Sequence, residues 1–266
     1  MSRIAMALLP CLSLLAWPAS AQEVPVDLEL VLAVDISGSV DIIEAAQQRQ
    51  GYVAALTDPA VANAIRSTFT GKVAVTYVEW AGAEQQEVLV PWTLLEDGAT
   101  AAAFAGAIAE ARTRRSMWTS ISGAVDFAVP LFEGNGFAGE RRVIDVSGDG
   151  PNNRGRPVTV ARDEALALGI VINGLPILND RPQPFDIPTP VEVALDRYYE
   201  ENVIGGPGSF IVPLRERDQF AEAVRTKLVR EIAGVIEPEP LVQKAQDRER
   251  ANCLIGESLR RQQWGP

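Results

Sequence analysis

The stretch VLAVDISGSVD, residues 31–41, decides how this chain folds. The apolar run 31–34, the end of a near-continuous apolar segment over 28–34, stops abruptly at Asp35, and Ser37 and Ser39 follow at alternate positions with a glycine between them. A near-continuous apolar run is typical of a parallel strand that is buried on both faces. The stretch therefore predicts a buried strand with a carboxylate and two hydroxyls at its carboxyl end.

The rest of the chain alternates strand patterns with helix patterns. This alternation predicts an α/β fold, a doubly wound and mostly parallel central sheet with one antiparallel edge strand and helices on both faces. Ligands of such sheets bind beyond the carboxyl ends of the strands, where the strand order reverses. Strands are predicted over 28–34, 72–80, 87–95, 141–146, 170–175 and 209–212; helices over 40–56, 58–67, 97–112, 120–132, 158–168, 191–202 and 217–232; and a long loop over 179–190.

The N-terminus has the pattern of a secretory signal peptide. Arg3 precedes an apolar run over 4–17, and Ala19-Ser20-Ala21 forms a cleavage motif. The run is too short to cross a bilayer, which takes about 20 apolar residues. We therefore expect an exported protein, periplasmic or secreted. The predicted division is a signal peptide over 1–21, one domain over 22–235 and a charged tail over 236–266 that is helical around 241–250.

Composition excludes several classes of function. The chain carries 24 Lys and Arg against 35 Asp and Glu, and this acidic balance argues against nucleic acid or an anionic membrane as a partner. The chain has no histidine, which removes Ser-His-Asp and Cys-His catalysis and every His-ligated metal site. Cleavage of the signal peptide removes Cys11 and leaves Cys253 alone, so the mature chain has no intrachain disulfide.

The residues at the end of the first strand predict a metal site. Asp35, Ser37 and Ser39 offer hard oxygen ligands, which suit octahedral Mg²⁺ or Mn²⁺ when other loops add further oxygens. Thr119 opens a predicted helix and Asp149 follows a predicted strand, so both lie where such oxygens are needed. A serine helix cap is the simpler interpretation, but it does not explain a carboxylate at a buried strand end.

These residues together resemble a known family. The run D-I-S-G-S at 35–39, followed by Thr119 and then Asp149, is similar to the metal-ion-dependent adhesion site (MIDAS) of von Willebrand factor A-like (vWA) domains. The resemblance covers about residues 25–235, and bacterial exported members without an assigned activity look most similar. It implies the Rossmann-like vWA fold and a divalent cation held by Asp35, Ser37, Ser39, Thr119 and Asp149.

Two departures from the family pattern affect the loops. Met117-Trp118 precedes Thr119 where the family commonly has glycine, and the third loop is Ser147-Gly148-Asp149-Gly150 where the family has T-D-G. Asp145 is the alternative acid for the third loop. It alternates with apolar neighbours inside a strand, so we favour Asp149.

The predicted function is an adhesion-type module that captures an acidic group of a partner protein through Mg²⁺ or Mn²⁺. We predict no catalytic residues, because the hydroxyls of the motif serve as ligands and no histidine is present as a base. The alternatives are a metal-dependent hydrolase that uses the same carboxylates and a structural vWA domain with an empty site. Trp118, with Met117 before it, is predicted to form an exposed aromatic rim. Arg112, Arg114 and Arg115 form a basic cluster beside the same loop. Each group either attracts a partner or only covers the loop.

A glycine-rich run over 134–139 matches G-x-G-x-x-G. A dinucleotide site needs that run between a strand and the helix that follows it. Here the run follows a predicted helix and precedes a predicted strand, so it is interpreted as a turn.

Overall fold

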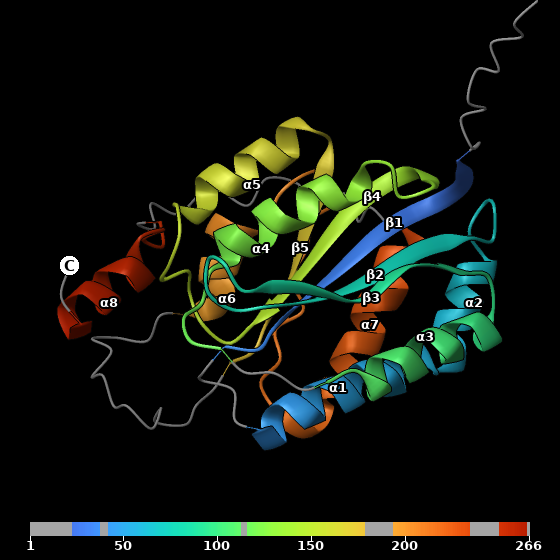
Figure 1. Cartoon of the computed structure of the whole chain (residues 1–266), viewed down its shortest axis with the longest axis horizontal. Coiled ribbons are helices and arrows are strands. Elements are labelled where there is room, and N and C mark those ends of the chain that lie inside the picture. The colour runs from blue at the N-terminus through green and yellow to red at the C-terminus, as the bar shows by residue number, and fades with distance from the viewer. Residues whose placement is uncertain (1–22, 38–41, 113–115, 179–193, 235–249, 265–266) are drawn as a thin grey trace, which may run out of the picture.

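A five-stranded sheet with the order β3-β2-β1-β4-β5 forms the centre of the molecule (Figure 1). The computed structural model describes residues 23–37, 42–112, 116–178, 194–234 and 250–264. Strand β1 pairs in parallel with β2 and with β4, β4 pairs in parallel with β5, and β3 runs antiparallel to β2 at the edge. The predicted fold class is therefore confirmed. The strands are β1 (Val24–Asp35), β2 (Val73–Trp80), β3 (Gln86–Leu95), β4 (Phe137–Gly148) and β5 (Ile170–Pro176).

The strand order reverses at β1, which has β2 on one side and β4 on the other. Val34 near the end of β1 is in register with Ser147 near the end of β4. Both strands therefore finish at the same edge of the sheet, and the loops that follow them emerge side by side. This is the place where an open α/β sheet binds its ligands.

Helices cover both faces of the sheet (Figure 1). One layer consists of α1 (Ile42–Leu56), α2 (Pro59–Arg66), α3 (Gly98–Glu110) and α7 (Phe220–Ala233), which follows a short 3₁₀ turn (Arg217–Gln219). The other layer consists of α4 (Ile121–Ala128) with a 3₁₀ extension (Val129–Phe132), α5 (Val158–Ala167) and α6 (Leu195–Tyr198), which continues into a π-helical turn (Tyr199–Val203).

The second half of strand β1, from Leu30 to Val34, has a continuous apolar sequence because both of its faces are buried. Successive side chains of a strand point to opposite faces. Leu28, Leu30, Leu32 and Val34 enter the core beneath the α1 layer, whereas Val31 and Ala33 enter the core beneath the α4 layer.

Some element boundaries differ from the prediction. Strands β1 and β4 begin earlier than expected because their first residues pair with each other, Val24 with Phe137. The strand predicted over 209–212 is wrong, since Ile211 makes only an isolated bridge to Gly174. The glycine-rich run 134–139 is a turn that enters β4, as predicted, and Gly134 and Gly136 have φ angles of 63° and 89°.

The C-terminal part of the chain contains a helix that the sequence pattern did not predict, α8 (Ile255–Trp264). The helix predicted around 241–250 falls almost entirely outside the described residues, as do the predicted signal peptide 1–21 and the loop over 179–190. Within the described ranges, no helix combines the length and apolar character needed to cross a membrane.

Candidate metal centre

Three loops meet beyond the carboxyl ends of β1 and β4. The first follows β1 and carries Asp35 and Ser37, the second precedes α4 and carries Thr119, and the third follows β4 and carries Asp149. Backbone hydrogen bonds join the first two loops, because Ser116 donates to the Ile36 carbonyl at 3.4 Å and pairs with Ser37 in a short parallel bridge. Ser39, the remaining predicted ligand, lies outside the described residues.

Asp35 is a fully buried carboxylate that the protein only half satisfies. Its side chain is 0 % exposed, and its Oδ1 accepts a hydrogen bond from the Ser37 backbone at 2.7 Å. Its Oδ2 has no hydrogen-bond partner among the described residues. Burial and then the neighbouring negative charge of Asp149 raise the pKa of Asp35 well above its usual value. A carboxylate in this state is costly unless a cation neutralises it, so the site fits a divalent metal.

The hydroxyl ligands lie close to this carboxylate. Thr119 Oγ1 and Ser37 Oγ are 3.4 Å apart, and both side chains are buried. A Cβ atom on Gly150 would lie 3.9 Å from Thr119 Oγ1, which places the start of the third loop beside the second. The structure thus brings Asp35, Ser37 and Thr119 together, with half-buried Asp149 near enough to shift the pKa of Asp35.

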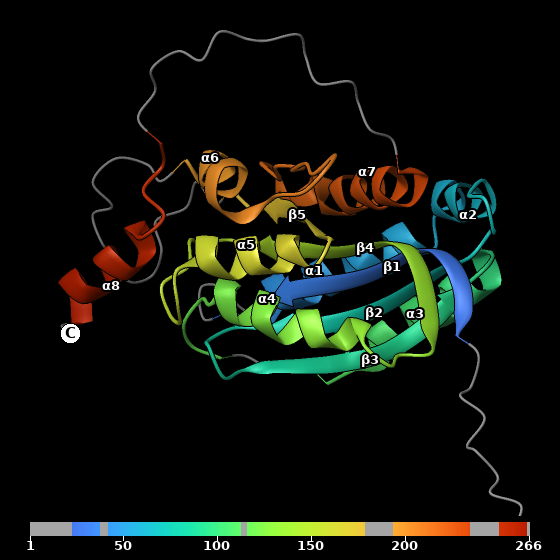
Figure 2. The same cartoon turned by 90° about the horizontal axis from the view of Figure 1, so that it is seen from above.

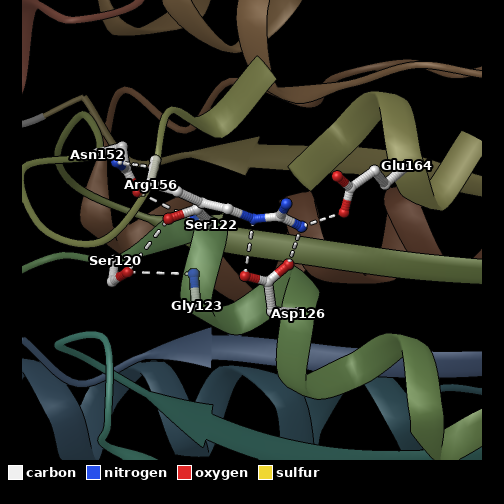
Figure 3. A network of polar contacts seen from close by, with 7 residues as sticks. All are labelled: Ser120, Ser122, Gly123, Asp126, Asn152, Arg156 and Glu164. Atoms are coloured by element: carbon white, nitrogen blue, oxygen red, sulfur yellow. Dashed lines mark hydrogen bonds and ion pairs between the residues drawn. The ribbon is translucent and has the colours of Figure 1, made fainter. Parts of the chain in front are cut away.

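A network of polar contacts joins the second loop to the third. The Thr119 backbone donates to Asn153 Oδ1 at 2.9 Å, and Asn153 donates back to the Thr119 carbonyl at 2.8 Å. Ser120 caps α4 by accepting from the Gly123 backbone (Figure 3). Its hydroxyl also donates to the Arg154 carbonyl at 2.9 Å. These bonds hold Thr119 in a fixed position relative to the loop that carries Asp149.

Asn152 and Arg156 extend the same network (Figure 3). Asn152 Oδ1 accepts from the Ser122 backbone at 3.0 Å, and Asn152 Nδ2 donates to the Arg156 carbonyl at 3.2 Å. The Arg156 guanidinium then donates to Asp126 on α4 and to Glu164 on α5. The third loop is therefore fastened to two helices of one layer.

Trp118, directly before Thr119, has an unusual backbone conformation. Its φ angle is 73°, and no other described residue except glycine has a positive φ. A bulky residue in this region is strained and persists only where its surroundings hold it. The family commonly has glycine before the threonine, so the departure noted in the sequence has a structural counterpart here. Met117 beside it is 61 % exposed, whereas Trp118, the aromatic residue of the predicted rim, is half-buried.

Tyr199 is a site residue that the sequence analysis missed. It lies on the π-helical turn, is fully buried, and its hydroxyl has no hydrogen-bond partner among the described residues. A Cβ atom on Gly148 would lie 2.9 Å from this hydroxyl and 3.0 Å from Asp35 Oδ2. Glycine at 148 therefore leaves room between two unpartnered polar atoms. Burial, with Asp35 and Asp149 nearby, raises the pKa of Tyr199, so its hydroxyl keeps the proton that it can donate.

Asp145, the alternative acid, belongs to a different cluster. It lies inside β4, and its Oδ1 is 2.8 Å from Lys227 Nζ on α7. Lys227 also pairs with Glu231, which accepts from Asn173 at 3.1 Å. Lys227, Asp145 and Glu231 are at most 2 % exposed. Asp145 thus joins the sheet to α7, whereas Asp149 follows the end of the strand.

The remaining predicted features are only partly described. Arg112 is exposed after α3, and Arg114 and Arg115 lie outside the described residues. No group of three Cys, Asp or Glu side chains that could hold a metal occurs in the described part of the chain. A cation at this site would therefore depend on hydroxyl oxygens together with two carboxylates.

The strand order and the two helical layers have the fold of von Willebrand factor A-like domains. The family described as "Protein of unknown function (DUF1194)" matches residues 25–236, and the chain belongs to this family. A search of curated proteins found no match.

Solved structures support the fold. Proximal thread matrix protein 1 from the mussel byssus matches with a TM-score of 0.57 and 14 % identity, over 80 % of this chain and 49 % of its own. A form of that protein was solved with a zinc-occupied MIDAS motif. A von Willebrand factor type A protein from Catenulispora acidiphila matches with a TM-score of 0.54 and 16 % identity, over 78 % of this chain and 43 % of its own. This chain thus spans about half the length of the mussel protein and less than half of the Catenulispora protein. At such identities the likeness concerns the fold alone.

Proposed function

We propose that this protein is an exported binding module that captures a carboxylate of a partner protein through Mg²⁺ or Mn²⁺. The observation that carries the proposal is Asp35 Oδ2, a buried carboxylate oxygen without a hydrogen-bond partner among the described residues. The hydroxyls of Ser37 and Thr119 lie 3.4 Å apart in the adjoining loops, and Asp149 is near enough to raise the pKa of Asp35. Hard oxygen ligands of this kind favour Mg²⁺ or Mn²⁺.

The proposed ligands are Asp35, Ser37, Thr119 and Asp149, with Ser39 as a further ligand from the sequence motif. Mg²⁺ gives up its waters reluctantly and keeps several of them in protein sites. The loops lie at the edge of the sheet, so a partner can approach from solvent and replace one water with a Glu or Asp carboxylate. A charge-assisted contact of this kind anchors an interface that also uses the exposed Met117 beside it.

A binding role explains the residues better than hydrolysis does. A hydrolase needs a base or a nucleophile beside the metal. Asp35 and Asp149 serve as ligands in our proposal, and the chain has no histidine to act as the base. We therefore propose that the protein is not an enzyme.

The metal is tested first, on the mature protein without a partner. Titration with Mn²⁺, followed by electron paramagnetic resonance, should give saturable binding that Asp35→Asn abolishes. Asp163→Asn, on the exposed surface of α5, is the matched control and should bind as the wild type does. The absence of saturable Mn²⁺ or Mg²⁺ binding to the wild type would overturn the proposed site.

The partner is tested next. The immobilised mature protein is exposed to the exported proteins of its own cells in Mg²⁺ and in chelator. We expect proteins that are retained only in Mg²⁺, released by chelator, and not retained by Asp35→Asn or Thr119→Ala. Equal retention in Mg²⁺ and in chelator would leave the metal without a role in capture.

A further inference from the structure

The C-terminal segment Ala251–Trp264 lies against the loops of the candidate metal centre. In both Figure 1 and Figure 2, α8 lies beyond the end of the sheet at which β1 and β4 finish. The family match ends at residue 236, so this segment is an addition outside the matched region. Its contacts show which parts of the site it reaches.

The first residues of the segment contact the turn that carries Tyr199. Ala251 donates to the Glu201 carboxylate and its carbonyl accepts from Asn202 Nδ2 at 3.1 Å. The Tyr198 hydroxyl donates to the Cys253 carbonyl at 3.4 Å. The segment is thus attached to the π-helical turn next to the metal centre and to Tyr198, the residue before that turn.

The start of α8 contacts the third loop through Asn152, which is 0 % exposed. Asn152 Nδ2 donates to Glu257 Oε1 at 2.7 Å, while its Oδ1 accepts from the Ser122 backbone at the start of α4. Gly256 packs so closely that a Cβ atom would lie 2.1 Å from the Asn152 carbonyl oxygen. One buried side chain therefore links α8 to the helix that follows Thr119.

The end of α8 contacts the second loop. The rings of Trp264 and Trp118 meet edge to face with centroids 6.2 Å apart, and the Arg154 guanidinium lies 5.4 Å from the Trp118 ring. Trp118 is the residue with the strained backbone directly before Thr119. Its ring is thus held between α8 and the third loop, and this explains how the strained conformation persists.

We propose that the segment Ala251–Trp264 is an intramolecular partner of the metal loops, and that its docking holds Trp118 and Thr119 in the conformation that binds the cation. The effect on the cation rests on the proposed function, whereas the effect on the loop conformation does not. Because coupling between two binding events is reciprocal, docking strengthens cation binding and the cation strengthens docking by the same factor.

Gly256→Ala in the full mature chain is the variant that tests docking. Its methyl group would meet the Asn152 carbonyl, so α8 must move away while the residues of the domain stay unchanged. Gly106→Ala is the matched control, because a Cβ atom at Gly106 meets nothing within 4 Å. The measurement is amide hydrogen exchange by mass spectrometry in chelator, for peptides that cover 251–264 and 117–123.

We expect Gly256→Ala, but not Gly106→Ala, to accelerate exchange in both peptides by about tenfold or more. Faster exchange in 251–264 alone would overturn the proposal, because the loop would then be independent of the segment. The double variant Glu257→Ala/Trp264→Ala provides a second route, and labelling of the Cys253 thiol reports release of the segment. If neither variant releases it, the docking surface is refuted.

A Mg²⁺ titration then separates this inference from the proposed function. Released variants should bind Mg²⁺ about 5- to 150-fold more weakly than the wild type, the usual range for coupled sites. In the wild type, Mg²⁺ should slow exchange in 251–264. Unchanged Mg²⁺ affinity in a released variant would refute the coupling. A wild type that binds no Mg²⁺ would refute the proposed function, while exchange in chelator would still decide whether docking holds the loop.

Discussion

Replacement of Asp35 by Asn should separate metal binding from stability. In the metal-free protein the Asp35 carboxylate is fully buried, and burial together with Asp149 raises its pKa. An ionised form is therefore destabilising at neutral pH when no cation is bound. Asn has nearly the same shape without the charge. We expect metal-free Asp35→Asn to melt at the same temperature as the wild type or higher, and to lose all response to Mg²⁺.

The size of the response follows from linkage. A ligand that binds only the folded state, present at 100 times its Kd, adds about 2.7 kcal/mol to the free energy of unfolding. For a domain of 150–250 residues, 1 kcal/mol shifts Tm by about 2–4 °C. Saturating Mg²⁺ should therefore raise the Tm of the wild type by about 5–11 °C. The Ser37, Thr119 and Asp149 ligands alone should not retain a cation without Asp35.

The assay is scanning calorimetry of the mature protein at pH 7 in Mg²⁺ and in chelator. Asp163→Asn serves as the control for the loss of an exposed carboxylate and should keep the full shift. A Mg²⁺ shift that persists in Asp35→Asn would refute the reasoning, since it would place the cation elsewhere. So would metal-free Asp35→Asn melting well below the wild type, because the carboxylate would then be satisfied without a metal.

Four further outcomes are expected. Mg²⁺ titration calorimetry should show that Asp149→Asn loses affinity and Asp145→Asn keeps it; the opposite result would mean that the third loop is misassigned. Tyr199→Phe should bind Mg²⁺ about tenfold more weakly without unfolding, the usual cost of losing a group that supports the ligands; unchanged affinity would make Tyr199 a packing residue only. Urea unfolding should show that Lys227→Met costs about 3–5 kcal/mol at pH 7, because two buried carboxylates lose their cation; a cost below about 1 kcal/mol would contradict this. Burial and Glu231 raise the pKa of Asp145 to about 7. Between about pH 4 and 7 the folded state therefore keeps a proton on Asp145 that the unfolded state releases. The free energy of unfolding should fall as pH rises through this range, and Asp145→Asn should remove that fall.

Sequence reasoning found the sheet because its signal is local. The buried strand that ends in Asp35 is apolar at every position from Leu30 to Val34, and this is the direct result of a helical layer on each face. The position of Thr119 just before a helix and that of Asp149 just after a strand were equally readable, because helix starts and strand ends leave clear patterns. The approach of Thr119 to Ser37 depends on the loop between α3 and α4, which the bridge between Ser116 and Ser37 joins to the end of β1.

The parts that sequence reasoning missed depend on contacts between distant segments. Tyr199 has the sequence surroundings of an ordinary core residue, and only the missing side chain of Gly148 places its hydroxyl near Asp35. Helix α8 docks through a few contacts near its two ends, those of Ile255, Gly256, Glu257 and the terminal Trp264. Neither contact leaves a periodic signal.

The buried cluster on α7 limits how this domain can transmit a change of state. Lys227 on the helix lies 2.8 Å from Asp145 on β4, with Glu231 one turn further along. Sliding α7 along the sheet by one turn would carry Lys227 about 5.4 Å away and leave the Asp145 carboxylate without its cation in the core. The contact between Lys227 and Asp145 therefore holds α7 in one register on the sheet. A displacement of α7 along the sheet is therefore disfavoured as a way of passing a change of state to the metal loops.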